Sequence, residues 1–319
     1  MVSSRTRKDL AAEVAARLRR PGLRGASPPH TVRGLAILTL AAAAVMGGAR
    51  AEEHRAIVFA VGTSTYDTGL LDDLVPPFEK ENGTSVKVIP VGSGQALALA
   101  ARGEADLVLS HAPEAEQDYM ARGLGTARLR MMRNQFILVG PPEDPAGISG
   151  ARSAREALSA ISRSGAGFVS RGDDSGTHML ERKLWQQTST GPPAGPSYME
   201  TGQGQGATLR IASEKQAYAL TESGTYHALA RVLQLAILYR GGVEWRNVYH
   251  LIIVNPANGS RVNAEGALRL ARYLLSPATQ ERVRKYGLER FGQALFVPDS
   301  EPLSSAGPGQ RDTDTPMTR

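Results

Sequence analysis

Residues 56–65 read AIVFAVGTST, a short apolar run that ends in a glycine and three hydroxyl residues. Its length and its β-branched residues are typical of a buried strand. The next segment, 66–80, carries apolar residues at the spacing of one helix face, namely Leu70, Leu71, Leu74, Val75 and Phe78. The stretch therefore predicts a strand that leads through a polar turn into an amphipathic helix.

The same pattern continues along the chain. Residues 85–91 (SVKVIPV) predict a second strand, 95–102 a helix and 106–110 (DLVLS) a third strand. Strands that alternate with helices indicate an α/β fold with a parallel sheet covered on both faces. Further strands are predicted at 135–140, 167–170, 197–201 and 248–254, and further helices at 151–162, 176–187, 207–213, 226–240, 263–275 and 277–287.

The basic excess of the chain lies at its N-terminus. The formal net charge is +6, but residues 1–51 hold nine Lys or Arg against two acidic residues, so the remainder is close to neutral. A nearly neutral body argues against nucleic acid as a partner. The uncharged run 35–46 is too short to span a bilayer comfortably and is followed by an Ala-x-Ala pattern ending at Ala51. We expect a cleavable signal peptide over 1–51, with a short membrane anchor as the alternative, and hence a periplasmic protein.

Two further features bear on the exported form. The chain has no cysteine, which excludes disulfides and lipid attachment through an N-terminal cysteine. Residues 301–319 are rich in Ser, Gly, Pro, Asp and Thr, and we expect a disordered tail there.

Residues 170–178, SRGDDSGTH, raise the question of catalysis. A nucleophile elbow needs glycine two residues before and two residues after the serine, whereas Asp173 and Thr177 occupy those positions around Ser175. Triad partners also come from distant parts of a chain. A secreted serine hydrolase that uses Ser175 therefore remains only as a minor alternative, and we expect no enzyme.

Metal and cofactor sites are weakly supported. The six histidines form no closely spaced pair and cysteine is absent, so we expect no zinc or soft-metal site. Residues 202–207 (GQGQGA) match part of a dinucleotide-binding loop, but no acidic residue ends a following predicted strand at the required distance. We expect no cofactor.

An anion is the better candidate ligand. Three turns rich in Gly, Ser and Thr follow predicted strands, at 62–65, 92–94 and 172–177. The first turn of a helix carries unpaired N–H groups and a partial positive charge, and small residues let an anion approach them. Arg171 could add a full charge and planar donors. Helix capping alone could explain each turn, but together the turns favour an anion site.

Long stretches of the sequence resemble the tungstate-binding proteins of bacterial ABC importers. The resemblance covers most of residues 55–298 and is carried by 63–83, 91–116, 134–147, 170–178 and 202–226. It implies a periplasmic-binding-protein type II fold, with two α/β lobes and a ligand cleft between them. Lobe 1 would comprise 52–136 and 253–300, and lobe 2 would comprise 137–252. The crossing segments would lie near 135–139 and 251–255.

The resemblance also implies a function: capture of tungstate, or of molybdate, and delivery to an ABC permease with its ATPase. We expect a monomer whose only bound group is the transported solute. The implied oxyanion-binding residues are Thr63, Ser64, Ser93, Arg171, Ser175, Thr177, Gly202, Gly204 and Tyr226.

Two points leave the choice of oxyanion open. The family often has three threonines before the Ser-Thr pair, whereas this chain has Val61, Gly62 and Thr63. A phosphate or sulfate binder on the same fold is the alternative. A fully ionised oxyanion has only acceptors, whereas monoprotonated phosphate also needs an acceptor from the protein. We expect Asp173 and Asp174 to cap the helix and to stay out of the pocket; a carboxylate in the pocket would favour phosphate.

Overall fold

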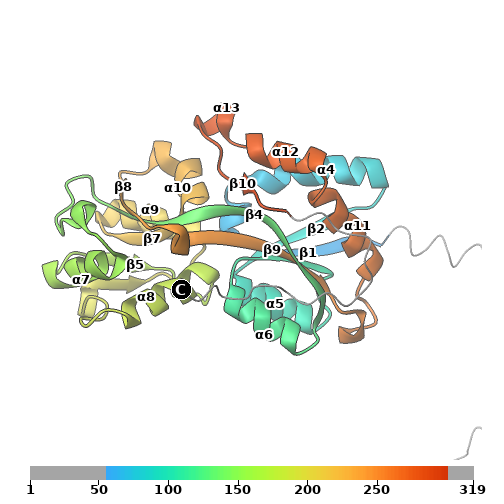
Figure 1. The fold of residues 1–319 in the computed structure, drawn as a ribbon, viewed down its shortest axis with the longest axis horizontal. Coiled ribbons are helices and arrows are strands. Elements are labelled where there is room, and N and C mark those ends of the chain that lie inside the picture. The colour runs from blue at the N-terminus through green and yellow to red at the C-terminus, as the bar shows by residue number, and fades with distance from the viewer. Residues whose placement is uncertain (1–54, 301–319) are drawn as a thin grey trace, which may run out of the picture. The chain divides into compact units, whose positions relative to one another are not determined.

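The structure is a computed structural model, and it describes residues 55–300 (Figure 1). The predicted signal peptide, 1–51, and the predicted tail, 301–319, lie outside the described residues. The main sheet has the strand order β10-β4-β9-β3-β1-β2, and β7 and β8 also pair with β4. The strands are β1 (Ile57–Gly62), β2 (Val86–Val91), β3 (Leu107–Ser110), β4 (Gly125–Gly140), β5 (Phe168–Ser170), β6 (Tyr198–Glu200), β7 (Ala219–Glu222), β8 (Ala236–Arg240), β9 (Arg246–Val254) and β10 (Val297–Pro298).

Helices cover both faces of the sheet, as an α/β fold requires. Around β1, β2 and β3, helices α4, α11 and α12 lie on one face, and α5 and α6 lie on the other (Figure 1). We call this part lobe 1, and we call the part around β5 to β8 lobe 2. The α-helices are α3 (Thr63–Tyr66), α4 (Leu70–Asn82), α5 (Ser93–Ala101), α6 (Pro113–Ala121), α7 (Ala154–Ser164), α8 (Gly176–Gln186), α9 (Gln205–Lys215), α10 (Ser223–Leu229), α11 (Ala264–Leu274), α12 (Pro277–Lys285) and α13 (Leu288–Phe291).

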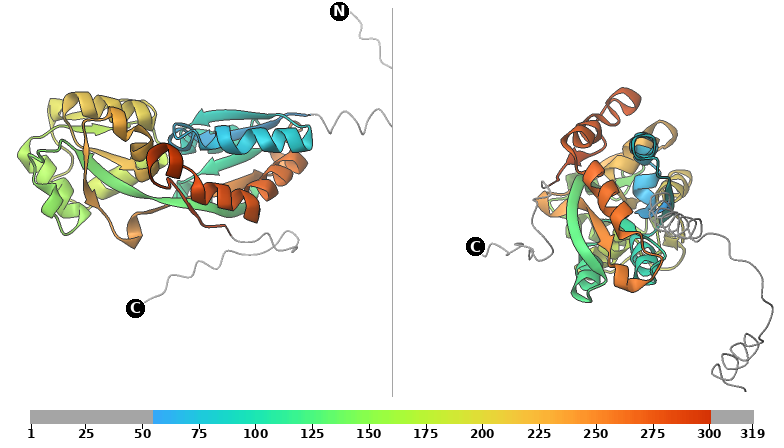
Figure 2. Two further views of the ribbon diagram at one scale, coloured as in Figure 1. Left: turned by 90° about the horizontal axis from the view of Figure 1, so that it is seen from above. Right: turned by 90° about the vertical axis from the view of Figure 1, so that its right-hand side faces the viewer.

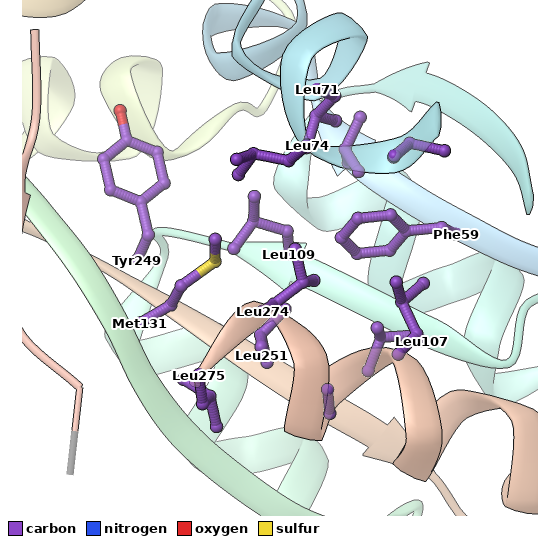
Figure 3. Packing of buried hydrophobic residues seen from close by; sticks show 14 of the residues in the cluster. Phe59, Leu71, Leu74, Leu107, Leu109, Met131, Tyr249, Leu251, Leu274 and Leu275 are labelled. Carbon is purple, nitrogen blue, oxygen red and sulfur yellow. The ribbon is translucent and has the colours of Figure 1, made fainter. Parts of the chain in front are cut away.

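The core of lobe 1 forms where the apolar face of α4 meets the sheet. Phe59 of β1 packs among Leu74 of α4, Leu107 of β3 and Leu274 of α11 (Figure 3). Every one of these side chains is fully buried. The predicted apolar stripe of 66–80 is therefore the face that α4 turns to the sheet, and it holds the turn at 62–65 against the end of β1.

Lobe 2 has the same layered construction. Helices α7 and α8 pack on one side of β4 and β7 through residues such as Leu158 and Trp185. Helices α9 and α10 pack on the other side through residues such as Leu209 and Tyr226. The small parallel pair of β5 and β6 is joined to β7 by a bridge between Phe168 and Tyr218. The turns that follow β5 and β6 thus point toward lobe 1.

Two long strands connect the lobes. β4 pairs antiparallel with β9 from Gly125 to Gln135, and then with β7 and β8 from Phe136 to Gly140. Figure 2 shows β4 passing from one lobe into the other. The predicted crossing near 135–139 falls on this strand, while the exact lobe boundaries remain a prediction.

The sheet differs from the prediction in three places. Only β1, β2 and β3 are mutually parallel, because β9 enters antiparallel beside β3. β4 begins ten residues earlier than the predicted strand at 135–140, at Gly125. The predicted helix at 226–240 is wrong: α10 ends at Leu229 and 236–240 is strand β8, because its pairing with β4 outweighs the helix propensity of Leu and Ala.

Candidate functional site

Arg171 connects the two lobes. It follows β5, its side chain is 1% exposed, and its Nη2 donates to Thr63 Oγ1 in lobe 1 at 2.9 Å. The same nitrogen also donates to the carboxylate of Asp173. Its Nε has no hydrogen-bond partner among residues 55–300. A buried guanidinium with an unused donor can bind a further acceptor.

Two hydroxyls beside the β1 and β2 turns are also buried. Ser93 is the first residue of α5, and Thr65 lies in α3; both are fully buried. Neither Ser93 Oγ nor Thr65 Oγ1 has a partner within the described part of the chain. Native proteins rarely leave buried hydroxyls unsatisfied, so such groups at the ends of parallel strands mark a site for an acceptor.

The turn after β5 packs directly on the turn after β2. A side-chain carbon at Gly92 would lie 3.5 Å from the carbonyl oxygen of Asp173, and one at Gly94 would lie 3.2 Å from that of Asp174. Ser93 is therefore next to the start of α8. Two of the three predicted donor-rich turns meet here, one from each lobe.

The aspartates of this turn behave differently from each other. Asp174 points outward, with a side chain 74% exposed that bonds to Arg182 at 3.2 Å. Asp173 instead bonds to Arg171, and it accepts the N–H of Ser175 at 3.2 Å. The expectation that both aspartates cap the helix is thus wrong, because Ser175 provides the cap, Asp174 points outward and the Asp173 carboxylate lies on the donor group of Arg171. The short spacing from Arg171 brings the Asp173 carboxylate back onto the guanidinium.

Ser175 is the residue that caps α8. Its Oγ accepts the N–H of His178 at 3.4 Å, and the His178 ring accepts the N–H of Asp174 at 3.0 Å through Nδ1. The serine hydroxyl is thus a helix cap, and the histidine is turned to the backbone. This arrangement is not a nucleophile paired with a base, which argues against the hydrolase alternative.

The predicted hydroxyl donor of Thr177 is used elsewhere. Thr177 is fully buried, and its Oγ1 donates to the Oε1 of Glu222, at the end of β7. A hydroxyl has one proton, so this bond removes it as a donor to a ligand. The first-turn N–H groups of Gly176 and Thr177 are the donors that α8 offers instead.

The predicted glycines and the tyrosine take three different positions. Gly204 approaches lobe 1, since a side-chain carbon there would lie 3.4 Å from Thr63 Cβ. Gly202 donates its N–H to the carbonyl of Arg171 at 2.8 Å, so it supports the arginine turn. The Tyr226 hydroxyl donates to the Leu235 carbonyl at 2.8 Å and faces the core of lobe 2. The structure does not bring Tyr226 to the junction, because α10 is short and turns its ring inward.

Sequence reasoning missed two buried residues at the junction, His111 and Glu222. His111 follows β3 and its Nε2 lies 3.4 Å from Ser64 Oγ. The same nitrogen is 3.7 Å from Oε1 of Glu222, in lobe 2. The position of His111, directly after the predicted strand at 106–110, could have identified it. Glu222 could not be found, because its segment resembles a helix end.

The lobes contact each other directly at several points. Asp67 accepts the N–H of Gly206, at the start of α9, at 3.0 Å, and Thr225 donates to the carbonyl of Ser64 at 3.1 Å. A side-chain carbon at Gly176 would lie 2.7 Å from the carbonyl oxygen of His111. Only glycine allows α8 to come this close to lobe 1.

Burial controls the ionisation of two groups at the junction. Burial lowers the pKa of His111, while the charge of Glu222 acts in the opposite direction. Burial also raises the pKa of Asp67, against the hydrogen bond from Gly206. Within 55–300, no three His, Asp or Glu side chains are grouped as metal ligands would be. No helix in that range combines the length and the apolar character needed to cross a bilayer.

Two α/β lobes that share a strand pair and bring polar turns together define the class of two-lobed solute-binding proteins. A model described as "PBP superfamily domain" matches residues 48–278. The tungstate-binding protein TupA of Peptoclostridium acidaminophilum is 41% identical over 76% of this chain and 86% of the relative. The chain belongs to the family of these TupA proteins, within the PBP superfamily.

Solved structures agree with this assignment. The tungstate ABC transporter structure from Geobacter sulfurreducens matches with a TM-score of 0.65 and 42% identity, over 72% of this chain and 98% of the other. TupA from Desulfovibrio alaskensis G20 matches with a TM-score of 0.64 and 40% identity, over 77% of this chain and 100% of the other. The predicted fold class and family are confirmed.

Proposed function

We propose that this chain captures tungstate, with molybdate as the close alternative, between its two lobes and delivers it to an ABC permease. The family relationship supports the choice of anion, because the related proteins named above are tungstate-binding proteins. The predicted signal peptide supports an exported, periplasmic protein. The proposal assigns no chemistry to the chain, since the family is one of solute-binding proteins.

The buried guanidinium of Arg171 carries the proposal. It spans the two lobes and keeps an unused Nε donor within the described residues. The hydroxyls of Ser93 and Thr65 add donors that lack partners in the same range. A tetrahedral dianion offers only acceptors, and charge-assisted hydrogen bonds to such groups are strong when water is excluded.

Capture and delivery follow from the two-lobed construction. Thr63 and Ser93 belong to lobe 1, whereas Arg171 and the start of α8 belong to lobe 2. An anion that binds both sets of donors stabilises the closed arrangement over the open one. A permease that recognises the closed arrangement can then distinguish loaded from empty protein.

Hydrogen phosphate is a second candidate, and Asp173 is the observation that favours it. Its carboxylate lies on Arg171, so an acceptor for a protonated oxyanion is present beside the donors. Monoprotonated phosphate could donate to that carboxylate, whereas tungstate would have to displace it from the guanidinium.

A thermal-shift panel of tungstate, molybdate, sulfate and phosphate tests the proposal. At a concentration near 100 Kd, a ligand stabilises the native state by about 2.7 kcal/mol. We expect tungstate to raise the melting temperature by roughly 5–10 °C. A larger shift with phosphate would support the second candidate, and no shift with any of the four anions would contradict both.

A further inference from the structure

His111 and Glu222 face each other directly behind the proposed anion site. Their side chains are 1% and 0% exposed, and Nε2 lies 3.7 Å from Oε1. We infer that His111 is a further determinant of oxyanion binding: it sets where the Ser64 hydroxyl points, and with Glu222 it takes up a proton when a dianion is captured. The inference rests on the proposed function and extends it to the linkage between binding and pH.

The tautomer of neutral His111 follows from its hydrogen bonds. The amide nitrogen of Asn247 donates to Asn134 Oδ1 at 2.9 Å and to the Tyr249 hydroxyl at 2.8 Å. The Asn247 Oδ1 therefore faces His111 Nδ1, at 3.0 Å. Because that oxygen can only accept, Nδ1 carries the proton, and Nε2 of the neutral ring carries a lone pair.

That lone pair determines what Ser64 can do. Because a lone pair only accepts, a hydrogen bond between Ser64 and the neutral ring must be donated by the serine hydroxyl. Ser64 Oγ lies 3.4 Å from His111 Nε2. While the ring is neutral, the Ser64 hydroxyl points to the histidine and away from a ligand.

Glu222 favours protonation of the His111 ring, against the larger effect of burial. Its Oε1 accepts from Thr177, and its Oε2 has no hydrogen-bond partner within 55–300. The carboxylate and the Nε2 lone pair are both acceptors, so nothing binds them to each other. One proton on Nε2 corrects this and lets the ring donate to Ser64 or Glu222. The Ser64 proton can then turn to the anion.

The negative charges at the junction favour uptake of this proton when a dianion binds. Arg171 bonds to Asp173, and the charges of Arg171, Arg210 and Glu222 all act on Asp67, so three acidic groups lie around the buried guanidinium of Arg171. The charged groups that act on His111 itself are Glu222 from β7, Arg171 from the turn after β5, and Glu116 from α6. Burial of a further dianion without compensation is costly.

The direction of the linkage is fixed by these charges. Burial keeps the pKa of His111 low, so the ring is neutral in the protein without anion. A dianion nearby favours the charged ring and raises that pKa. The proton comes from bulk water and binds Nε2, and no other bond changes. Affinity therefore falls as pH rises from the lowered His111 pKa of the free protein to the higher His111 pKa of the complex, and it is constant above that.

Isothermal titration of tungstate into the full chain, in two buffers of very different ionisation enthalpy, measures the protons taken up. We expect uptake approaching one proton per anion near neutral pH. As pH rises above the lowered His111 pKa of the free protein, the tungstate Kd should increase by up to about tenfold per pH unit, until the His111 pKa of the complex is passed. An enthalpy that is independent of the buffer, together with a Kd that is independent of pH, would overturn the inference while leaving the proposed function intact.

Two variants at the junction test whether His111 is the residue that takes up the proton. His111→Gln keeps an amide that can bond to Asn247 but cannot titrate, so the uptake should disappear. Glu222→Gln should reduce the uptake and tighten binding several-fold at the upper end of the pH range, because one negative charge is removed. Should His111→Gln fail to fold, proton uptake measured for Glu222→Gln and for the wild type in the two buffers still tests the inference.

The matched control is His227→Gln, since His227 stacks edge-on with Tyr226 and the charged group that acts on it is Arg240, not a member of the junction. Its uptake should equal that of the wild type. Uptake that persists unchanged in both junction variants would place the proton on the anion and overturn the inference. Absence of tungstate binding in every buffer would instead contradict the proposed function itself.

Discussion

The protein contains two buried clusters of charge that are built in opposite ways. In lobe 1, Glu116 accepts from Arg128 Nε and lies beside His250 Nδ1, each at 2.9 Å, and it also accepts the Ala112 N–H at 2.8 Å. We call this the lobe 1 cluster. The junction cluster comprises Arg171, Asp173, Glu222 and His111.

The two clusters differ in how many of their hydrogen-bonding atoms have a partner. The Glu116 carboxylate has a partner on each of its oxygens. In the junction cluster, Arg171 Nε and Glu222 Oε2 lack partners among the described residues. A saturated cluster fixes structure, whereas buried donors that are left unsatisfied are costly unless a ligand uses them. Burial of charge alone therefore does not indicate a ligand-binding site, whereas buried hydrogen-bonding atoms without a partner do.

Removal of Arg171 should produce the largest effect and tests the junction side of this comparison. We expect Arg171→Ala to weaken tungstate binding by on the order of a hundredfold or more, because the buried anion loses its cationic partner. Calorimetry measures the affinity. Arg182→Ala is the matched control, since its side chain is 57% exposed and bonds outward to Asp174. Equal affinities in the two variants would contradict the role of Arg171.

Substitution in the lobe 1 cluster should affect stability much more than binding. Burial alone would raise the pKa of Glu116, but the hydrogen bond and charge of His250, with the charge of Arg128, lower it to about 2. We expect Glu116→Gln to lower the free energy of unfolding by about 3 kcal/mol at neutral pH, measured by urea denaturation. Tungstate affinity should change far less than in Arg171→Ala, because Glu116 acts on the site only through its charge on His111.

The pH dependence of this loss has a definite sign. A folded-state pKa below the ordinary glutamate value of 4.5 means that the stabilisation is fully present above about pH 4.5. The difference between wild type and Glu116→Gln should narrow as pH falls from 4.5 toward 2. A constant difference over that range would show that packing, and not ionisation, accounts for the loss.

Ser93 should give the smallest effect and sharpens the comparison. Ser93→Ala removes a hydroxyl that has no partner within residues 55–300, so its free energy of unfolding should change little. Its tungstate affinity should fall about tenfold, the value of one hydrogen bond to a charged group. Tyr226→Phe is the opposite case: loss of the bond to Leu235 should cost about 1 kcal/mol of stability and leave affinity unchanged. The reverse pattern in these two variants would contradict the assignment.

Much of the fold was predictable, because buried strands and amphipathic helices leave strong periodic signals. The apolar runs before 62 and before 92 became β1 and β2, and the apolar stripe of 66–80 became the buried face of α4. The first half of β4 was missed since its arginines at 128, 130 and 133 interrupt the apolar pattern. The strand β8 was predicted as helix because its local sequence favours helix, and only its pairing with β4 stabilises the strand.

The residues of the site also fall into those that the sequence could predict and those that it could not. Residues that belong to a motif, such as Thr63 and Arg171, could be proposed from the sequence, and the structure brings these two within 2.9 Å. His111 follows β3 and Glu222 ends β7, so the two residues lie 111 positions apart in the chain and no local pattern connects them. The hydrogen bond from the Thr177 hydroxyl to Glu222 could not be predicted for the same reason.

The paired strands β4 and β9 restrict the mechanics of the molecule. Their antiparallel ladder continues from Gly125 to Gln135, and β4 then carries the strands of lobe 2 on the same backbone. Sliding of one lobe past the other would break this ladder or shift its register by whole residues. Bending and twisting of a single ribbon leave every hydrogen bond in place. Separation of the lobes is thus confined to bending and twisting of two paired strands, so a few distances measured between the lobes would describe it.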